Sequence, residues 1–211
     1  MKAIHVKPVP VPRDDHPDPP YEQLPKHEFT LGLIAPKGAG KTTTICNLLN
    51  FYKGHFHTIL VYSPTIQCDD KWDYVKKQKL LCENKPLKKW VKEMTARELE
   101  NKVVQGEPIS TKLSKKMEES FDPIIPESHF FEDYAEDHFM NIMEEQKALI
   151  TMLKKYKKPK FLANRILIVF DDLVGSSLFN GSRGSYFKGV NTRHRHYSAS
   201  FLMVSQGYLF F

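Results

Sequence analysis

The sequence has few cysteines and no long hydrophobic run, and both shortages restrict what the chain can be. Its three cysteines, Cys46, Cys68 and Cys82, are unevenly spaced and form no C-x-x-C pair, which argues against a disulfide scaffold or a zinc knuckle and favours a reducing compartment. No apolar run reaches the roughly 20 residues that cross a bilayer, and residues 1–12 lack the apolar core of a signal peptide. We therefore expect the protein to act inside a cell or inside a particle assembled there.

Length and charge narrow the class of protein further. With 211 residues, the chain has room for one α/β domain with a sizeable core and one modest insertion. Hydrophobic residues make up 41% and charged residues 27%, so wholesale disorder is not expected. The formal net charge of +6 suits a polyanionic partner such as DNA, but many soluble enzymes share such a charge.

Proline is concentrated at the amino end. Residues 1–25 hold seven of the 14 prolines of the chain. Such a segment prefers extended polyproline conformations and buries little surface. We interpret residues 1–25 as an arm that is floppy or docks on a neighbouring subunit, and residues 26–211 as one folded core.

The chain is organised around one stretch, Leu31–Asn50, which reads LGLIAPKGAGKTTTICNLLN. An apolar run breaks into a loop of small residues and resumes as an amphipathic helix, which is the layout of a strand, a phosphate loop and a helix. The loop matches the Walker A pattern with alanine in place of the first glycine. Its predicted nucleotide-binding residues are Ala35, Pro36, Lys37, Gly38, Ala39, Gly40, Lys41, Thr42 and Thr43.

Each residue type in this loop has a chemical reason. Glycines at positions 38 and 40 let the backbone N–H groups approach phosphate oxygens at the positive end of the helix, whereas Pro36 offers no N–H. Lys41 would reach the β- and γ-phosphates, and the Thr42 hydroxyl would complete the shell of Mg²⁺. The alternative is a glycine-rich turn with an incidental lysine. The pattern predicts ATP and Mg²⁺ as ligands.

The middle of the chain changes character. The apolar run His57–Tyr62 predicts a second buried strand, with His55 and His57 at its edge, and its spacing from the loop predicts a βαβ unit. Residues 69–160 are predicted to form an α-rich insertion, with lysine-rich helical texture at first and an amphipathic helix over roughly Phe130–Lys155. The lysines either face DNA phosphates or line an ordinary solvated face. The expected fold is therefore an α/β fold of the P-loop NTPase type, with a mostly parallel central sheet flanked by helices.

The run RILIVFDD, residues 165–172, predicts a Walker B strand. A continuous apolar sequence indicates a strand that is buried on both faces, and its two terminal carboxylates would lie beside the phosphate loop. Asp171 would hold Mg²⁺ and Asp172 would orient the attacking water. A buried strand with a plain Asp-Asp turn is the alternative.

The last predicted strand, Ser200–Val204, is flanked by further candidates. Gln206 follows it and could hydrogen-bond the attacking water or the γ-phosphate as a sensor. Arg193 and Arg195 precede it, so they would point away from the phosphate loop of their own subunit and would better serve a neighbour in a ring. Plain surface arginines are the alternative.

Four motifs together resemble one family. The set GAGKT, VYSPT, ILIVFDD and RHYSASFLMVSQ, in this order between residues 28 and 206, is similar to the genome-packaging ATPases of poxviruses, other large DNA viruses and their virophages, within the FtsK–HerA superfamily. The resemblance implies that Lys41 and Thr42 bind phosphate and Mg²⁺, that Gln206 is the sensor, and that Arg195 rather than Arg193 is the arginine finger. Relatives continue with further strands where this chain stops, at Phe211, which implies a truncated carboxyl end or an unusually small sheet.

The resemblance also implies partners and a place of action. It implies a homo-oligomeric ring that moves double-stranded DNA into a capsid, contacts with capsid proteins, and action in a virion or at a site of virus assembly. The alternatives are a replicative helicase or AAA-type ATPase, a nucleotide kinase, and a relic that binds nucleotide without hydrolysing it. Duplex unwinding would indicate the helicase or AAA-type ATPase, and a phosphorylated nucleoside product would indicate the kinase. Nucleotide binding without turnover would indicate the relic.

Overall fold

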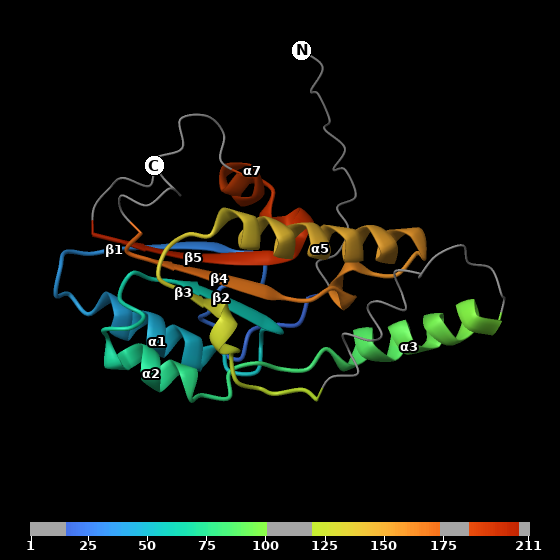
Figure 1. The fold of residues 1–211 in the computed structure, drawn as a ribbon, viewed down its shortest axis with the longest axis horizontal. Helices are drawn as coiled ribbons and strands as arrows, with labels where there is room; N and C mark the ends of the chain where they lie inside the picture. Colours follow the sequence, from blue (N-terminus) through green and yellow to red (C-terminus); the bar gives the residue numbers. More distant parts are fainter. Residues whose placement is uncertain (1–15, 101–119, 174–185, 207–211) are drawn as a thin grey trace, which may run out of the picture.

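The computed structural model describes residues 16–100, 120–173 and 186–206, and the remaining residues lie outside the described part. The described chain forms an α/β fold whose sheet is entirely parallel (Figure 1). Its strands are β1 (Thr30–Ile34), β2 (Thr58–Tyr62), β3 (Phe130–Phe131), β4 (Ile166–Asp171) and β5 (Ala199–Ser205), in the spatial order β1-β5-β4-β2-β3. The predicted α/β class with a parallel sheet flanked by helices is confirmed.

Strand β4 lies at the centre of the core. All of its residues are buried, and it is hydrogen-bonded to β5 on one side and to β2 on the other. Because successive side chains of a strand point to opposite faces, Leu167 and Val169 pack in one apolar cluster and Ile168 and Phe170 in another. The continuous apolar run in the sequence is therefore explained by burial on both faces.

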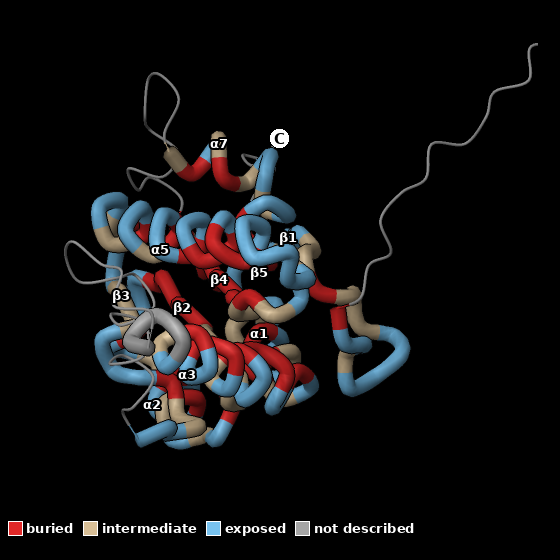
Figure 2. Tube along the Cα trace, turned by 90° about the vertical axis from the view of Figure 1, so that its right-hand side faces the viewer, coloured by how far each residue is buried: buried red, intermediate tan, exposed pale blue. Residues whose placement is uncertain are grey.

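Helices cover both faces of the sheet. Helices α1 (Lys41–Phe51) and α2 (Asp70–Lys76) lie on one face, and α5 (Glu136–Lys155) and α7 (Tyr186–Thr192) lie on the other (Figure 1). Residues four apart, Ile45 with Leu49 in α1 and Phe139 with Met143 in α5, turn one side of each helix toward the sheet. Figure 2 shows the buried residues gathered on the strands and on the helix sides that face them. None of the described helices combines the length and the apolar character needed to span a bilayer.

Helix α3 (Lys85–Glu100) packs on α5 and forms a third apolar cluster with it. The cluster contains Leu87 and Val91 of α3 and Leu153 of α5. Asn84 fixes the start of α3, because its Oδ1 accepts the Leu87 N–H at 3.2 Å. The region predicted as an α-rich insertion, residues 69–160, thus contains α2, α3 and α5.

The prediction of one helix from about Phe130 to Lys155 is wrong at its start. Phe130–Phe131 form β3, the edge strand beside β2, and α5 begins only at Glu136. The Phe131 ring stacks on Tyr62 at 4.8 Å between centroids, and the Phe131 carbonyl accepts the Ser63 N–H at 2.9 Å. These partners are distant in the sequence, so the helical spacing of the apolar residues gave no sign of them.

The described end of the proline-rich segment contacts the core. The Tyr52 hydroxyl donates to the Pro25 carbonyl at 2.7 Å, and His16 is buried. Residues 1–15 of the predicted arm lie outside the described part, so the prediction of an arm is not tested for these residues.

Two serines fix the orientation and tautomer of the buried His27. Ser200 Oγ accepts the backbone N–H groups of Glu28 at 3.0 Å and Phe29 at 3.3 Å, so its own proton is donated to His27 Nδ1 at 2.9 Å. The Nε2–H of His27 is then donated to Ser198 Oγ at 3.0 Å. The neutral imidazole thereby ties the chain before β1 to Ser198, directly before β5, and to Ser200 within β5.

His55 and His57 lie just before β2, as expected, but they do not face solvent. His55 is only 4% exposed. His57 is partly buried, and its Nδ1 accepts the Arg165 N–H at 2.8 Å. Burial and the nearby Arg165 charge lower the pKa of His55 to about 4 and that of His57 to about 3. Both histidines are therefore neutral parts of the core.

Candidate nucleotide-binding site

The carboxyl ends of β1, β5, β4 and β2 meet at one edge of the sheet. In the parallel register, Ile34 of β1 is level with Ser205 of β5, and Asp171 of β4 is level with Val204 of β5. Adjacent strands lie about 4.8 Å apart. Because β5 runs between β1 and β4, Gln206 at the end of β5 has the phosphate loop on one side and the acidic pair on the other.

The predicted phosphate loop connects β1 to α1. Its two inner glycines adopt the left-handed backbone conformation that the turn requires. Gly38 and Gly40 both have φ of 80°, a left-handed conformation that residues with a Cβ rarely adopt. Gly40 is also the N-cap of α1, where no side chain caps the helix and no acidic residue occupies the first turn. The exposed N–H groups at this helix end suit an anion.

Lys41 folds back over the loop. Its Nζ donates to the carbonyls of Ala35 at 3.0 Å and Pro36 at 3.1 Å. Its positive charge also acts on the carboxyl group at the end of β4, two strands from β1, because it contributes to lowering the pKa of Asp171. The fold therefore brings the predicted lysine and the predicted metal-binding carboxylate into one electrostatic environment.

Asp171 ends β4 and is 3% exposed. Burial raises the pKa of its carboxyl, and the adjacent Asp172 raises it too, whereas the hydrogen bond from Ser63 and the charge of Lys41 lower it. A buried carboxylate beside a second acid is an oxygen ligand of the kind that divalent cations prefer. The role of Asp171 as a Mg²⁺ ligand stays a prediction.

Asp172 and Gln206, which follow the adjacent strands β4 and β5, contact each other. Asp172 adopts φ of 52°, and its N–H donates to the Val204 carbonyl at 3.0 Å. This turns its side chain toward the end of β5, where Gln206 Nε2 donates to Asp172 Oδ2. The structure thus joins the second predicted acid to the predicted sensor.

Sequence reasoning missed the part that Ser63 plays. The second strand is predicted to end at Tyr62 and Ser63 has no predicted role, yet the buried hydroxyl of Ser63 donates to Asp171 Oδ2 at 2.9 Å. A serine directly after a buried parallel strand, at the edge where the acidic pair also ends, was the available signal.

Arg193 and Arg195 lie at the opposite edge of the sheet from the loop. Both precede β5, whose length at about 3.3 Å per residue separates them from the acidic pair by roughly 20 Å. Arg193 Nε donates to the Gly189 carbonyl at 3.0 Å, while Arg195 is exposed and forms no ion pair within the described ranges. The structure therefore does not bring Arg195 together with Lys41 and Asp171 of the same chain.

A second cluster of potential ligands does not have the character of a metal site. Ligand atoms of His16, His27 and Glu28 lie within 4.8 Å of one another. However, both ring nitrogens of His27 are engaged by serines, and the Lys160 ammonium contacts Glu28 Oε1. A cation already neutralises the carboxylate, so the cluster is explained as a polar link within the fold.

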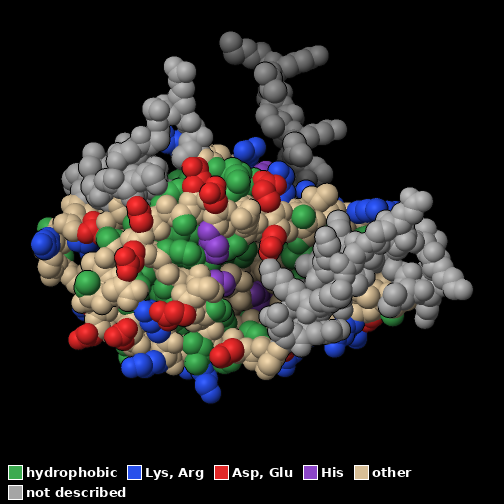
Figure 3. Space-filling model, viewed as in Figure 1, with side chains coloured by type: hydrophobic (Ala, Val, Ile, Leu, Met, Phe, Trp, Pro, Cys, Tyr) green, Lys and Arg blue, Asp and Glu red, His purple; other side chains and the backbone are tan. Residues whose placement is uncertain are grey.

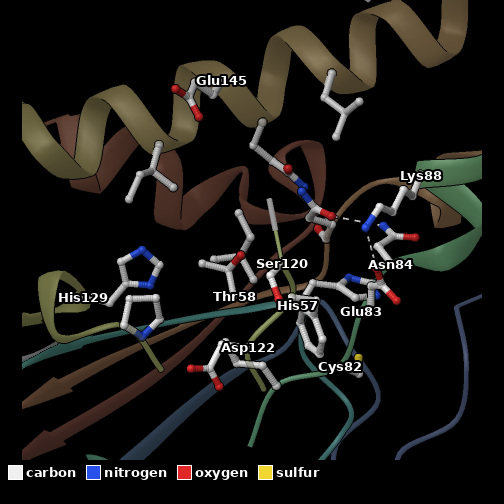
Figure 4. A pocket seen from close by; sticks show the side chains of 18 residues that line it. His57, Thr58, Cys82, Glu83, Asn84, Lys88, Ser120, Asp122, His129 and Glu145 are labelled. Atoms are coloured by element: carbon white, nitrogen blue, oxygen red, sulfur yellow. Dashed lines mark hydrogen bonds and ion pairs between the residues drawn. The ribbon is translucent and has the colours of Figure 1, made fainter. Parts of the chain in front are cut away.

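A cavity of about 440 Å³ also lies away from the loop. It opens between α3, α5 and the amino ends of β2 and β4 (Figure 4). The Lys88–Glu83 ion pair at 2.8 Å and the Asn84 side chain line one wall. Its polar groups are mostly used within the fold, because Gln146 Nε2 donates to the Asn164 carbonyl and Asn84 Nδ2 to Asn164 Oδ1. The cavity is separate from the candidate nucleotide site.

Comparisons with known proteins add no family to this description. No protein-family model matches the chain, and no curated protein matches it significantly. The functional argument therefore rests on the edge of the sheet itself. Its donor set fits ATP·Mg²⁺, because an uncapped helix end and a lysine suit phosphates, and a hydroxyl and a carboxylate are the oxygen ligands that Mg²⁺ prefers.

Proposed function

We propose that this chain is a P-loop ATPase that binds ATP·Mg²⁺ between the loop after β1 and the acidic pair after β4. The observation that carries the proposal is the convergence of Lys41, Asp171, Asp172 and Gln206 at one edge of a parallel sheet. A glycine-rich turn with an incidental lysine would not require an amide at the end of the next strand, β5, and an acidic pair at the end of the strand beyond it, β4.

Each group has one task in hydrolysis. The N–H groups at the start of α1 and the Lys41 ammonium would hold the phosphates and stabilise the charge that develops on the γ-phosphoryl oxygens. Thr42 and Asp171 would hold Mg²⁺, which when bound neutralises charge on the β- and γ-phosphates. Asp172, oriented by Gln206, would accept a hydrogen bond from the attacking water and place it in line with the leaving group.

Double-stranded DNA is the partner that we propose. Figure 3 shows acidic and basic side chains interspersed over one face, so a broad basic surface is not the basis of the proposal. Instead, Lys85, Lys89 and Lys92 are exposed on α3 at spacings of four and three residues, which places them in one row along the helix. Such a row would contact phosphates without reading base sequence.

Reversing the charge of these three lysines should remove the stimulation of ATP hydrolysis by DNA. We expect the triple substitution Lys85→Glu, Lys89→Glu and Lys92→Glu to remove DNA stimulation of ATPase activity while basal turnover remains within about twofold. The slope of log affinity against log salt should become shallower by up to about 3, since each phosphate contact contributes close to one. Reversing the three exposed lysines Lys154, Lys155 and Lys157 controls for net charge. Equal losses in the two triple variants would contradict a specific role for α3.

The proposed motor is a homo-oligomeric ring in which Arg195 completes the site of a neighbour. Its exposed position at the edge of the sheet opposite the loop supports action between subunits. We expect an Arg195→Ala protein and a Lys41→Ala protein, each inactive alone, to recover part of the hydrolysis rate when mixed. Activity should recover because, in mixed rings, some interfaces join an intact phosphate loop of one subunit to an intact Arg195 of its neighbour. A mixture that stays as inactive as its components would contradict an arginine finger in trans.

The test of the whole proposal is ATP hydrolysis by the purified protein, with and without duplex DNA, over a range of protein concentrations. A packaging motor should show DNA-stimulated turnover whose specific activity rises with protein concentration, because sites between subunits form only on assembly. Strand separation would indicate a helicase instead. Nucleotide binding without turnover under every condition would indicate a relic and refute the proposed hydrolysis.

A further inference from the structure

A continuous chain of hydrogen bonds leads from helix α2 to the carboxylate at the end of β4. Trp72 of α2 donates its indole N–H to Thr65 Oγ1 at 3.3 Å. Thr65 Oγ1 lies 3.0 Å from Ser63 Oγ, and Ser63 Oγ donates to Asp171 Oδ2 at 2.9 Å. The fully buried Trp72 is packed in the same apolar cluster as residues of α1, so packing holds the first donor of this series of hydrogen bonds in place.

Chemistry fixes the direction of every bond in this chain. An indole N–H can only donate, and a carboxylate can only accept, so both ends are determined. Ser63 has one proton, which goes to Asp171, and Thr65 therefore donates its own proton to Ser63 while it accepts from Trp72. Ser63 Oγ also receives the Thr65 N–H at 3.3 Å. All donors point toward Asp171, and bonds aligned in this way strengthen one another.

We propose that Ser63 is a positioning residue for the divalent cation of the nucleotide site, and that Thr65 and Trp72 link the occupancy of that site to α2. This inference rests on the proposed function and deepens it. Ser63 occupies Oδ2 of Asp171, whereas Oδ1 accepts no hydrogen bond from any residue that the structure describes. The hydroxyl thus fixes the rotation of the carboxylate and leaves Oδ1 as the oxygen for the cation. Outer hydrogen bonds of this kind commonly set metal affinity.

The link to α2 supplies a reporter that does not depend on hydrolysis. The chain has two tryptophans, so Trp90→Phe leaves Trp72 as the single fluorophore. In that background, titrating Mg²⁺ into protein saturated with a non-hydrolysable ATP analogue should change the Trp72 emission. The nucleotide analogue in excess EDTA should leave that emission near its starting value.

Three variants test the inference. Ser63→Ala should raise the Mg²⁺ concentration for half-saturation by about 10- to 100-fold, with analogue binding in EDTA unchanged. Thr65→Val should raise the Mg²⁺ concentration for half-saturation by a smaller factor and should abolish most of the change in Trp72 emission. Thr65→Ser should restore the Mg²⁺ affinity and the emission change of the parent. Thr151→Val, which removes an exposed hydroxyl bonded to the Lys147 carbonyl on α5, is the matched control and should behave as the parent protein.

The outcomes separate this inference from the proposed function. Analogue binding with the same Mg²⁺ dependence in the parent, Ser63→Ala and Thr65→Val proteins would overturn the positioning role and leave the proposed function intact. No analogue binding by the parent would overturn both. If Ser63→Ala does not fold, judged by circular dichroism, the comparison of Thr65→Val with Thr65→Ser decides alone, because Thr65 is exposed and its substitution leaves the core intact.

Discussion

Replacing Lys41 by alanine is expected to reduce ATP hydrolysis by at least about 100-fold, the effect typical of removing one group that stabilises charge in a transition state. In the structure the ammonium is held over the loop by the carbonyls of Ala35 and Pro36 and is not part of the core. The variant should therefore fold normally. Phosphate release at saturating ATP and Mg²⁺ measures the loss.

A matched control removes a lysine close by in the sequence that has no part in the site. Lys53 is exposed just after α1, so Lys53→Ala should keep the parent rate. Unchanged turnover in Lys41→Ala would show that any hydrolysis comes from another site or from a contaminant. The proposed nucleotide site would then be wrong.

Mild acid should destabilise the fold strongly through buried histidines. Burial lowers the pKa of His55 to about 4, that of His57 to about 3 and that of His27 well below its usual value, and neighbouring positive charges, including Arg165, add to the effect. The unfolded chain takes up protons near pH 6.5 while the folded protein does not, so stability is complete above pH 6.5 and falls as the pH drops below it. Between pH 7 and pH 5, His55 and His57 should together cost about 4 kcal/mol.

Urea unfolding at pH 7 and pH 5 measures this loss. His57→Asn retains an acceptor near the Arg165 N–H but cannot titrate, so its free energy of unfolding should fall by about 2 kcal/mol less over the same pH interval. The exposed His196 provides the control, because His196→Asn should keep the pH dependence of the parent. Identical pH dependence in His57→Asn and the parent would contradict the buried, neutral state of His57.

The parts of the fold that local sequence determines were predictable. The phosphate loop and β4 each depend on a continuous run of residues, so their positions follow from glycine placement and from unbroken apolar character. The position of Gln206 at the same edge of the sheet as Asp172 could also be expected, because parallel strands end at a common edge, but the hydrogen bond between the two side chains was not predicted.

Contacts between distant segments were not predictable in the same way. Phe131 is drawn into β3 by Tyr62, although its own surroundings have helical spacing. His27 is fixed by Ser198 and Ser200, which follow it by more than 170 residues. Such pairings between distant residues cannot be inferred from a single sequence, because nothing in the local sequence distinguishes either partner from an ordinary polar or aromatic residue.

The order of the strands has a consequence for how the protein acquires its site. Strand β1 pairs only with β5 in the described part of the sheet, and β5 also forms one side of β4. The strand that joins the phosphate loop to the acidic pair is thus the last of the five to leave the ribosome. Until it inserts, β1 and β4 have no common partner, and closing so long a connection is a slow step. Under the proposed function, a nascent chain would therefore be unable to assemble the nucleotide site until β5 has inserted between β1 and β4.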